Sequence, residues 1–119
     1  MLVLANMKVI RKSEVKKHQN SASCTAFEYP IGDTDINGAV IAINGRYPDE
    51  GRVVNQVCKE MAYVIKGEGI VQIEGSVVEL SEGDLVLIQP GERYYWEGKL
   101  TMFVPCTPAW YPEQHKEVK

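Results

Sequence analysis

The stretch from Glu60 to Tyr94 constrains the fold more than any other part of the chain. It consists of apolar runs of strand length, separated by glycine-containing turns with the sequences KGEG, IEGS, SEGD and QPGE. Short apolar runs that alternate with tight turns are typical of closed or nearly closed antiparallel barrels. The stretch therefore predicts a small all-β domain.

The segments on both sides continue the same pattern. Apolar or alternating runs predict further strands, and the turns between them are rich in glycine, proline, asparagine and aspartate. We expect about ten strands in one antiparallel β-barrel of the jelly-roll type. The expected strands are 7–10, 23–29, 39–44, 52–58, 61–65, 70–73, 77–80, 85–88, 93–97 and 100–104.

A chain of 119 residues fits one domain and buries enough surface to need neither disulfides nor a structural metal. We expect a single domain over residues 1–119, with N-terminal strands and loops at 1–38, a barrel core at 39–105 and a C-terminal tail at 106–119. The charged segment RKSEVKKHQN that follows the first strand is expected to be a solvated loop.

Charge and cysteine content narrow the class of protein. Thirteen basic and sixteen acidic residues give a net charge of −3, which disfavours a nucleic-acid partner. No apolar run approaches the ~20 residues of a membrane-spanning helix, so no membrane partner is expected. Cys24, Cys58 and Cys106 are an odd number without a close-spaced pair, which argues against a disulfide framework or a zinc knuckle. The expected location is the reducing cytoplasm.

Two spaced motifs frame the stretch from Glu60 to Tyr94. In the first motif, Glu60 is followed by six residues and Gly67. In the second, Gly83 is followed by a strand, a Pro-x-Gly turn and Tyr94. Both motifs resemble those of the cupin superfamily of small β-barrels. The likeness covers about residues 39–105 and implies the cupin fold, with a metal-binding residue at the position of Tyr94.

The resemblance also implies a divalent metal held by three histidines and a glutamate, but only Glu60 of these is present. The histidine positions fall on Val54 and Gln56, or on Val53 and Asn55 with the longer motif spacing, and finally on Tyr94. An amide, a carboxylate and a neutral phenol form a poor ligand set. We expect no metal cofactor; if a divalent metal binds, its ligands are Gln56, Glu60 and Tyr94.

Without a metal, the inward side chains form a mixed pocket. Alternate residues of a strand share one face, so five of them are expected to point inward: Gln56, Cys58, Glu60, Tyr94 and Trp96. Such a pocket suits a small polar ligand with an apolar face, for example a sugar or a small organic acid. Arg52 and Arg93 are expected at the rim, where a guanidinium holds an anionic group.

Other readings of the same residues stay open. Tyr94 and Trp96 are β-formers that also fill barrel cores, and Cys58 is more simply a buried apolar residue than a nucleophile, since no histidine is near in sequence. His18 and His115 lie in a loop and in the tail, and we expect both at the surface.

Three functions follow from these readings. The first is a metal-free module that binds a carbohydrate or a small organic acid. The second is an enzyme resembling sugar-phosphate isomerases or epimerases, with Glu60 and Tyr94 as catalytic acid and base and with or without an atypical divalent metal site. The third is a filled barrel that acts as a structural or regulatory dimer. A homodimer is expected in each case, with the strand at 7–10 and the tail at Trp110–Tyr111 in the interface.

Overall fold

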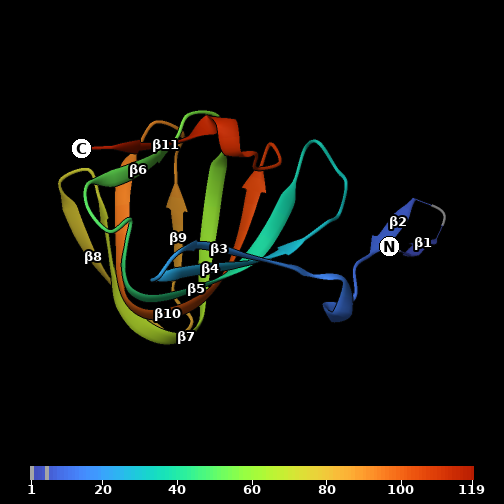
Figure 1. Ribbon diagram of the computed structural model, residues 1–119, viewed down its shortest axis with the longest axis horizontal. Helices are drawn as coiled ribbons and strands as arrows, with labels where there is room; N and C mark the ends of the chain where they lie inside the picture. The colour runs from blue at the N-terminus through green and yellow to red at the C-terminus, as the bar shows by residue number, and fades with distance from the viewer. Residues whose placement is uncertain (1, 5) are drawn as a thin grey trace.

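The computed structural model describes residues 2–4 and 6–119, and it is an all-β structure as the sequence predicts (Figure 1). The described part contains eleven strands and two 3-10 turns, at Lys12–Glu14 and Pro112–Gln114. No helix in this part has the length and apolar character needed to cross a membrane. The strands are β1 (Leu2–Leu4), β2 (Met7–Val9), β3 (Lys16–Ser21), β4 (Cys24–Tyr29), β5 (Asn37–Tyr47), β6 (Arg52–Asn55), β7 (Lys59–Ile73), β8 (Ser76–Ser81), β9 (Leu85–Ile88), β10 (Arg93–Thr107) and β11 (His115–Val118).

Nine of the strands form one antiparallel sheet that curls around the core. Along the main path the order is β11-β6-β10-β5-β4-β3, and β7 pairs with β10, β8 and β9. Figure 1 shows β6 and β11 together at one end of the curled sheet, with β3 and β4 crossing one of its sides. The remaining two strands, β1 and β2, form a separate hairpin that extends away from the barrel.

The pairing of β7 with β10 joins the two longest strands. Their register runs from Tyr94 opposite Ile73 to Thr107 opposite Lys59. On β7 the burial alternates, with Glu60, Ala62 and Val64 buried and the residues between them exposed. This alternation places one face of each long strand against the core. The interior is filled largely by Ile43, Val53, Val64, Val71, Ile88, Leu100 and Met102.

The sequence predicts a turn at Gly67–Gly69, but β7 continues through these glycines and bends instead. The bend meets a matching bend in β10 at Gly98, whose φ is +132°. A Cβ on Gly98 would lie 2.6 Å from the Cα of Gly69 and 2.7 Å from the carbonyl oxygen of Glu68. The glycines therefore allow the backbones of β7 and β10 to come into contact where the sheet bends sharply, a position that we call the corner.

Two strands of the barrel were not predicted from the sequence. The first, β3, replaces the expected loop after the first strand and pairs with β4 at the edge of the sheet. The second, β11, forms in the tail and pairs with β6. Both are edge strands rich in charged and polar residues, a composition that protects sheet edges from further pairing and that also hides the strand from a search for apolar runs.

The corner gives a direct test of this packing. Gly98→Ala is expected to lower the free energy of unfolding by about 2–4 kcal/mol, because the new methyl group overlaps backbone atoms and the residue is held at a positive φ. Denaturant unfolding followed by circular dichroism measures the change.

Gly75→Ala is the matched control, since a Cβ there meets no heavy atom within 4 Å and the φ of Gly75 lies outside the left-handed range. This variant is expected to stay within about 0.5 kcal/mol of the wild type. Equal destabilisation by the two substitutions would contradict the close approach at the corner.

Candidate functional site

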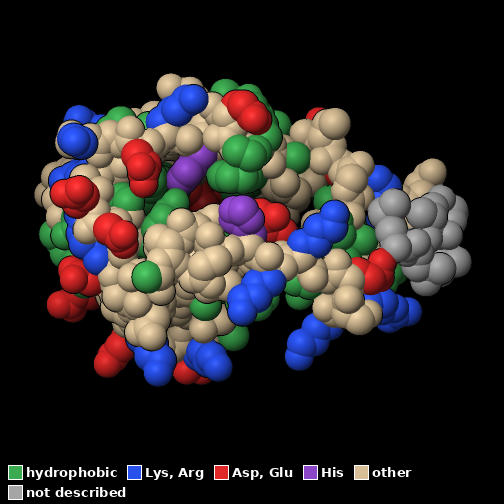
Figure 2. Space-filling view, in the orientation of Figure 1, with side chains coloured by type: hydrophobic (Ala, Val, Ile, Leu, Met, Phe, Trp, Pro, Cys, Tyr) green, Lys and Arg blue, Asp and Glu red, His purple; other side chains and the backbone are tan. Residues whose placement is uncertain are grey.

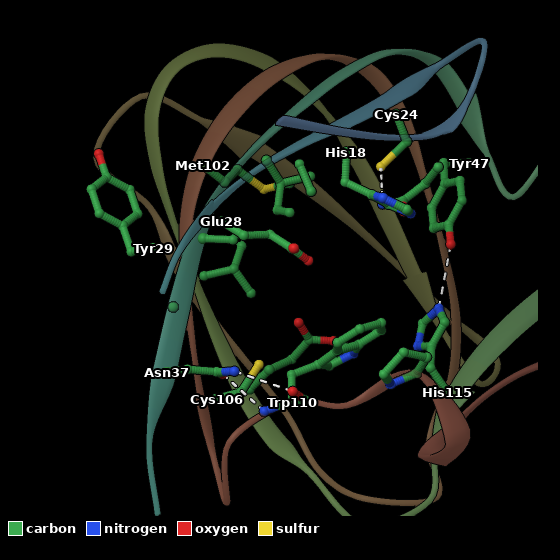
Figure 3. A pocket seen from close by; sticks show the side chains of 18 of the residues that line it. His18, Cys24, Glu28, Tyr29, Asn37, Tyr47, Met102, Cys106, Trp110 and His115 are labelled. Atoms are coloured by element: carbon green, nitrogen blue, oxygen red, sulfur yellow. Dashed lines mark hydrogen bonds between the residues drawn. The ribbon is translucent and has the colours of Figure 1, made fainter. Parts of the chain in front are cut away.

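The barrel encloses a cavity of about 490 Å³ that opens to solvent. Its lining comes from β3, β4, β5, β7, β10 and the segment 110–115. Figure 2 shows the opening with the two histidine side chains of the chain beside it, and Figure 3 shows the lining from close by. Much of the wall is apolar, formed by Ala26, Ala39, Ile41, Ile43, Met102 and Val104.

A buried hydrogen-bond network fixes the polar end of the cavity, starting from backbone groups. The side-chain oxygen of Gln114 accepts from the backbone N–H groups of Val57 and Cys58 at 3.2 and 3.0 Å. The amide nitrogen of Gln114 therefore faces outward from these groups and donates to Oδ1 of Asn55 at 3.0 Å. This leaves Nδ2 of Asn55 as a donor toward the cavity.

The carboxyl group of Glu60 accepts the hydrogen bond from Nδ2 of Asn55. Nδ2 of Asn55 donates to Oε1 of Glu60 at 2.6 Å, and the hydroxyl of Tyr94 donates to the same oxygen at 2.5 Å. Nδ2 of Asn55 also lies 3.3 Å from the Tyr94 hydroxyl. The three side chains form a closed triangle in which each polar hydrogen has an assigned acceptor.

The second carboxyl oxygen of Glu60 is open to the cavity. The hydrogen bonds from Asn55 and Tyr94 both end on Oε1, and among the described residues every fully buried side-chain nitrogen or oxygen has a hydrogen-bond partner. Oε2 is therefore accessible, consistent with the position of Glu60 in the cavity lining. Burial raises the pKa of Glu60, and the hydrogen bonds from Tyr94 and Asn55 offset part of this effect. When the carboxyl group is protonated, the proton resides on Oε2, because Oε1 already accepts two hydrogen bonds.

His115 extends the network to the cavity edge. Its Nδ1 lies 2.8 Å from Oδ1 of Asn55, which is an acceptor, so Nδ1 carries the proton. The other ring nitrogen, Nε2, lies 3.3 Å from the hydroxyl of Tyr47 (Figure 3). Burial lowers the pKa of His115, which favours the neutral ring with Nε2 as an acceptor. Burial likewise raises the pKa values of Tyr47 and Tyr94, and both phenols keep their protons.

Trp110 is held against the cavity by two hydrogen bonds from β5. Its backbone N–H donates to the side-chain oxygen of Asn37 at 2.8 Å, and the Asn37 amide nitrogen donates to the Trp110 carbonyl oxygen at 3.1 Å (Figure 3). The indole lies 5.5 Å from the His115 ring, centroid to centroid. The tail thus packs on the barrel at Trp110 and supplies part of the site.

The structure brings together three of the predicted site residues. Glu60, Tyr94 and Trp96 all line the cavity, and the rings of Tyr94 and Trp96 meet edge to face with their centroids 6.0 Å apart. The inward direction assigned to these three residues from strand alternation is correct.

Four predicted residues lie elsewhere. Gln56 is exposed, because β6 ends at Asn55 and the inward position falls on Asn55 instead. Cys58 is fully buried but outside the cavity lining, with its Sγ 3.8 Å from the carbonyl oxygen of Ala109. Arg52 and Arg93 are not at the rim; they line a separate hollow, where Arg93 forms a 2.8 Å ion pair with Glu74.

Several lining residues were missed or misplaced by sequence reasoning. His18 is exposed, as expected, and it also lines the cavity, whereas His115 was expected at the surface but is only partly exposed. On β3 the exposed residues Lys16, His18 and Asn20 line the cavity at a spacing of two, because alternate residues of a strand share one face. Three further lining residues are Glu28, Asn37 and Tyr47. The sequence pattern gives no comparable signal for them, because their inward direction follows from the register of β4 and β5.

The side chains at the family's metal position do not fit a divalent cation. Oε1 of Glu60 already accepts two hydrogen bonds, and Asn55 presents an N–H donor there because its oxygen faces Gln114 and His115. The third group, Tyr94, is a protonated phenol. Within the described ranges no group of three or more His, Cys, Asp or Glu side chains is placed to hold a metal ion.

Solved structures with a similar fold are numerous. Pac13, a nucleoside dehydratase from Streptomyces, aligns with a TM-score of 0.85 at 17% identity, covering 95% of this chain and 92% of that chain. Three variants of Pac13 are in complex with uridine. Ectoine synthase from P. lautus aligns with a TM-score of 0.72 at 14% identity, over 95% of this chain and 91% of that one. KdgF from Halomonas sp. aligns with a TM-score of 0.66 at 15% identity, over 86% and 94%. At these identities the likeness concerns the fold.

Comparison at the level of sequence gives one family. No curated protein sequence matches the chain. The model of the EutQ-like cupin domain matches residues 44–104, which is 61 of the 119 residues and includes both motifs around Glu60 and Tyr94. The chain therefore belongs to the cupin superfamily, as a member with a EutQ-like cupin domain.

Proposed function

We propose that this protein binds a small organic molecule in the barrel cavity without the help of a metal. The observation that carries the proposal is the cavity itself, with Oε2 of Glu60 open at its polar end. Its volume of about 490 Å³ falls in the range of small-molecule sites, roughly 300–1,000 Å³. An apolar wall with a few oriented polar groups is the usual composition of such sites.

The lining suits a ligand with one flat or apolar face and polar groups on its edge. Trp96, Trp110 and Tyr47 offer aromatic surface, while Glu60 and His115 offer fixed hydrogen-bonding atoms. Sugars and small organic acids both have this character. The volume of the cavity weighs against the alternative of a filled barrel.

A second function, acid–base catalysis, is favoured by the Glu60 carboxyl group and the His115 ring. A carboxyl group with a raised pKa can donate a proton from Oε2, and a neutral imidazole held in one tautomer can accept one at Nε2. Such a pair suits the proton transfers of an isomerisation, an epimerisation or a dehydration. Tyr94 then donates a hydrogen bond instead of acting as a base. Pac13, which shares the fold, is a nucleoside dehydratase, and this supports the class.

We also propose a homodimer that uses the outer face of β7, β9 and β10. Met61 and Tyr63 face outward on β7, and across the strands they pair with Leu87 and Leu85 of β9. Phe103 of β10 pairs with Tyr63 on the other side. These side chains are each about 42–60% exposed and form one continuous apolar surface, which favours association with a second copy.

The remaining proposals concern the setting of the protein. The three cysteines are free and buried, which suits the reducing cytoplasm. We propose that residues 1–119 act as one domain and that neither nucleic acid nor a membrane is a partner.

The binding proposal predicts ligand-induced stabilisation. Screened by thermal shift against sugars, nucleosides and organic acids, the protein should respond to at least one class, since a ligand at 100 times its dissociation constant stabilises by about 2.7 kcal/mol. Trp110→Ala should weaken that ligand about tenfold, whereas the exposed neighbour Tyr111→Ala should leave its affinity unchanged. A panel without any shift, or equal losses in both variants, would count against the cavity as the binding site.

The protonation of Glu60 predicts a pH dependence of stability. Because the pKa is raised in the folded protein, the folded state keeps a proton that the unfolded chain releases near its ordinary value of 4.5. Stability is therefore lost as the pH rises from 4.5 through the folded pKa, by up to about 1.4 kcal/mol per pH unit. Glu60→Gln removes this contribution. The free energy of unfolding of the variant, measured in urea, should therefore rise relative to that of the wild type between pH 4 and pH 8.

The control is Glu79→Gln, which removes the negative charge of an exposed carboxylate on β8. It shows how the loss of one negative charge at the surface changes the stability. A difference between wild type and Glu60→Gln that stays constant across this pH range would refute the raised pKa.

The dimer proposal predicts a monomer when the apolar face is charged. Tyr63→Glu should shift the protein from dimer to monomer in sedimentation at micromolar concentration, because a carboxylate in the interface has no partner. Ile36→Glu, which charges an equally exposed apolar residue in the loop before β5, should leave the dimer intact. A wild-type monomer would overturn the proposal.

A further inference from the structure

We propose that Glu28 is the second polar anchor of the cavity and that the ligand is an uncharged, hydroxyl-rich ring compound, of the sugar or nucleoside type, in preference to an organic acid. The inference rests on the proposed small-molecule function. It adds a ligand-contacting residue to the site and decides between the two ligand classes.

Glu28 reaches the cavity from β4. Cys24, Ala26 and Glu28 line the cavity at a spacing of two along this strand, and Tyr29 at its end lines the cavity as well. Figure 3 shows the Glu28 side chain directed into the cavity from the strand that bears it. Its neighbour on β5 is Ala39, and beyond that lies Val104 of β10. The carboxylate thus projects from an apolar part of the wall.

No protein group in the described part of the chain satisfies this carboxylate. Glu28 makes neither a hydrogen bond nor an ion pair within 4.0 Å with any residue described. Lys16, opposite it on β3, is exposed. A half-buried carboxylate against an apolar wall is stable only when donors reach it. In the cavity those donors come from water or from the hydroxyl groups of a ligand.

Glu60 presents a second carboxyl group to the same cavity, from a different wall than Glu28. Glu28 on β4 and Glu60 on β7 are separated around the barrel by β5 and β10, so they approach the cavity space from two directions. A ring with hydroxyl groups on opposite edges can donate to Glu28 and contact Oε2 of Glu60 at the same time. The apolar wall and Trp110, which line the same cavity, suit the faces of such a ring.

The charges of the lining disfavour an anionic ligand. Among the described lining residues, Lys16 is the only lysine or arginine, and it lies at the mouth opposite Glu28. A carboxylate ligand would approach Glu28 without a buried cation to pair with, and like charges at short range repel. Neutral hydroxyl groups meet no such penalty and gain hydrogen bonds to a charged acceptor.

Matched pairs of ligands test the inference by isothermal titration calorimetry. The probes are glucose with glucuronate and galactose with galacturonate, in which the acid keeps the sugar ring, together with uridine as the nucleoside. We expect a neutral probe to bind, and its acid counterpart to bind at least tenfold more weakly. Glu28→Gln should weaken the neutral probe about tenfold or more and reduce its advantage over the acid.

Two controls keep the outcome interpretable. Glu79→Gln on β8 makes the same chemical change on the outer surface and should leave both affinities unchanged. Glu28→Asp keeps the charge but shortens the reach, and it should weaken the neutral probe while the discrimination against the acid persists. Thermal unfolding of each variant verifies that it is folded.

Other results overturn the inference in distinguishable ways. Neutral-probe binding that is lost in Trp110→Ala but unchanged in Glu28→Gln refutes the role of Glu28 and leaves the proposed function standing. Stronger binding of the acid member of a pair refutes the ligand class. Absence of binding by every probe, neutral and acidic, counts against both proposals.

Discussion

A carboxyl group buried inside a small barrel has to be hydrogen-bonded, and the arrangement of the site follows from meeting this requirement for Glu60. Asn55 and Tyr94 donate to one of its oxygens, Gln114 orients Asn55, and backbone N–H groups of the chain between β6 and β7 orient Gln114. Each amide is therefore held in one orientation by its neighbour. An unpaired partner anywhere along this path would leave a buried polar group at a cost of about 1–3 kcal/mol.

The same network occupies the positions at which the cupin resemblance implies metal ligands. Where the resemblance implies histidines, Asn55 and Tyr94 present polar hydrogens to Glu60 in place of lone pairs for a cation. The result is a site in which one carboxyl oxygen is held by the protein and the other is free. His115 and Trp110 come from the C-terminal tail and Tyr47 comes from β5, so the tail completes a pocket whose other walls are strands of the barrel.

The fold was predictable because its signals are local. Strand-length apolar runs between glycine turns, and two motifs at family spacing, are visible around Glu60 and Tyr94. The corner at Gly67–Gly98 was misread as a turn, since glycine in a sequence does not distinguish a chain reversal from a close approach of two backbones. The polar edge strands β3 and β11 were missed for a related reason: their partners, not their composition, make them strands.

The site was predictable only near the motifs. Glu60, Tyr94 and Trp96 follow from alternation along β7 and β10, which is uninterrupted at those positions. Gln56 was assigned inward by extending the same alternation beyond the end of β6, where the backbone leaves the sheet and the inward position belongs to Asn55. Glu28 depends on the register between the consecutive strands β4 and β5, and His115 depends on the pairing of β11 with β6, which lie far apart in the sequence.

The central claim is that the cavity beside Glu60 holds an organic molecule and no coordinated cation. A high-resolution crystal structure of the purified protein, with anomalous data to identify metals, tests it most directly. We expect density for a small organic molecule within hydrogen-bond distance of Oε2 of Glu60, with the hydrogen bonds from Asn55 and Tyr94 to Oε1 intact. A metal ion coordinated by Asn55, Glu60 and Tyr94 would contradict it.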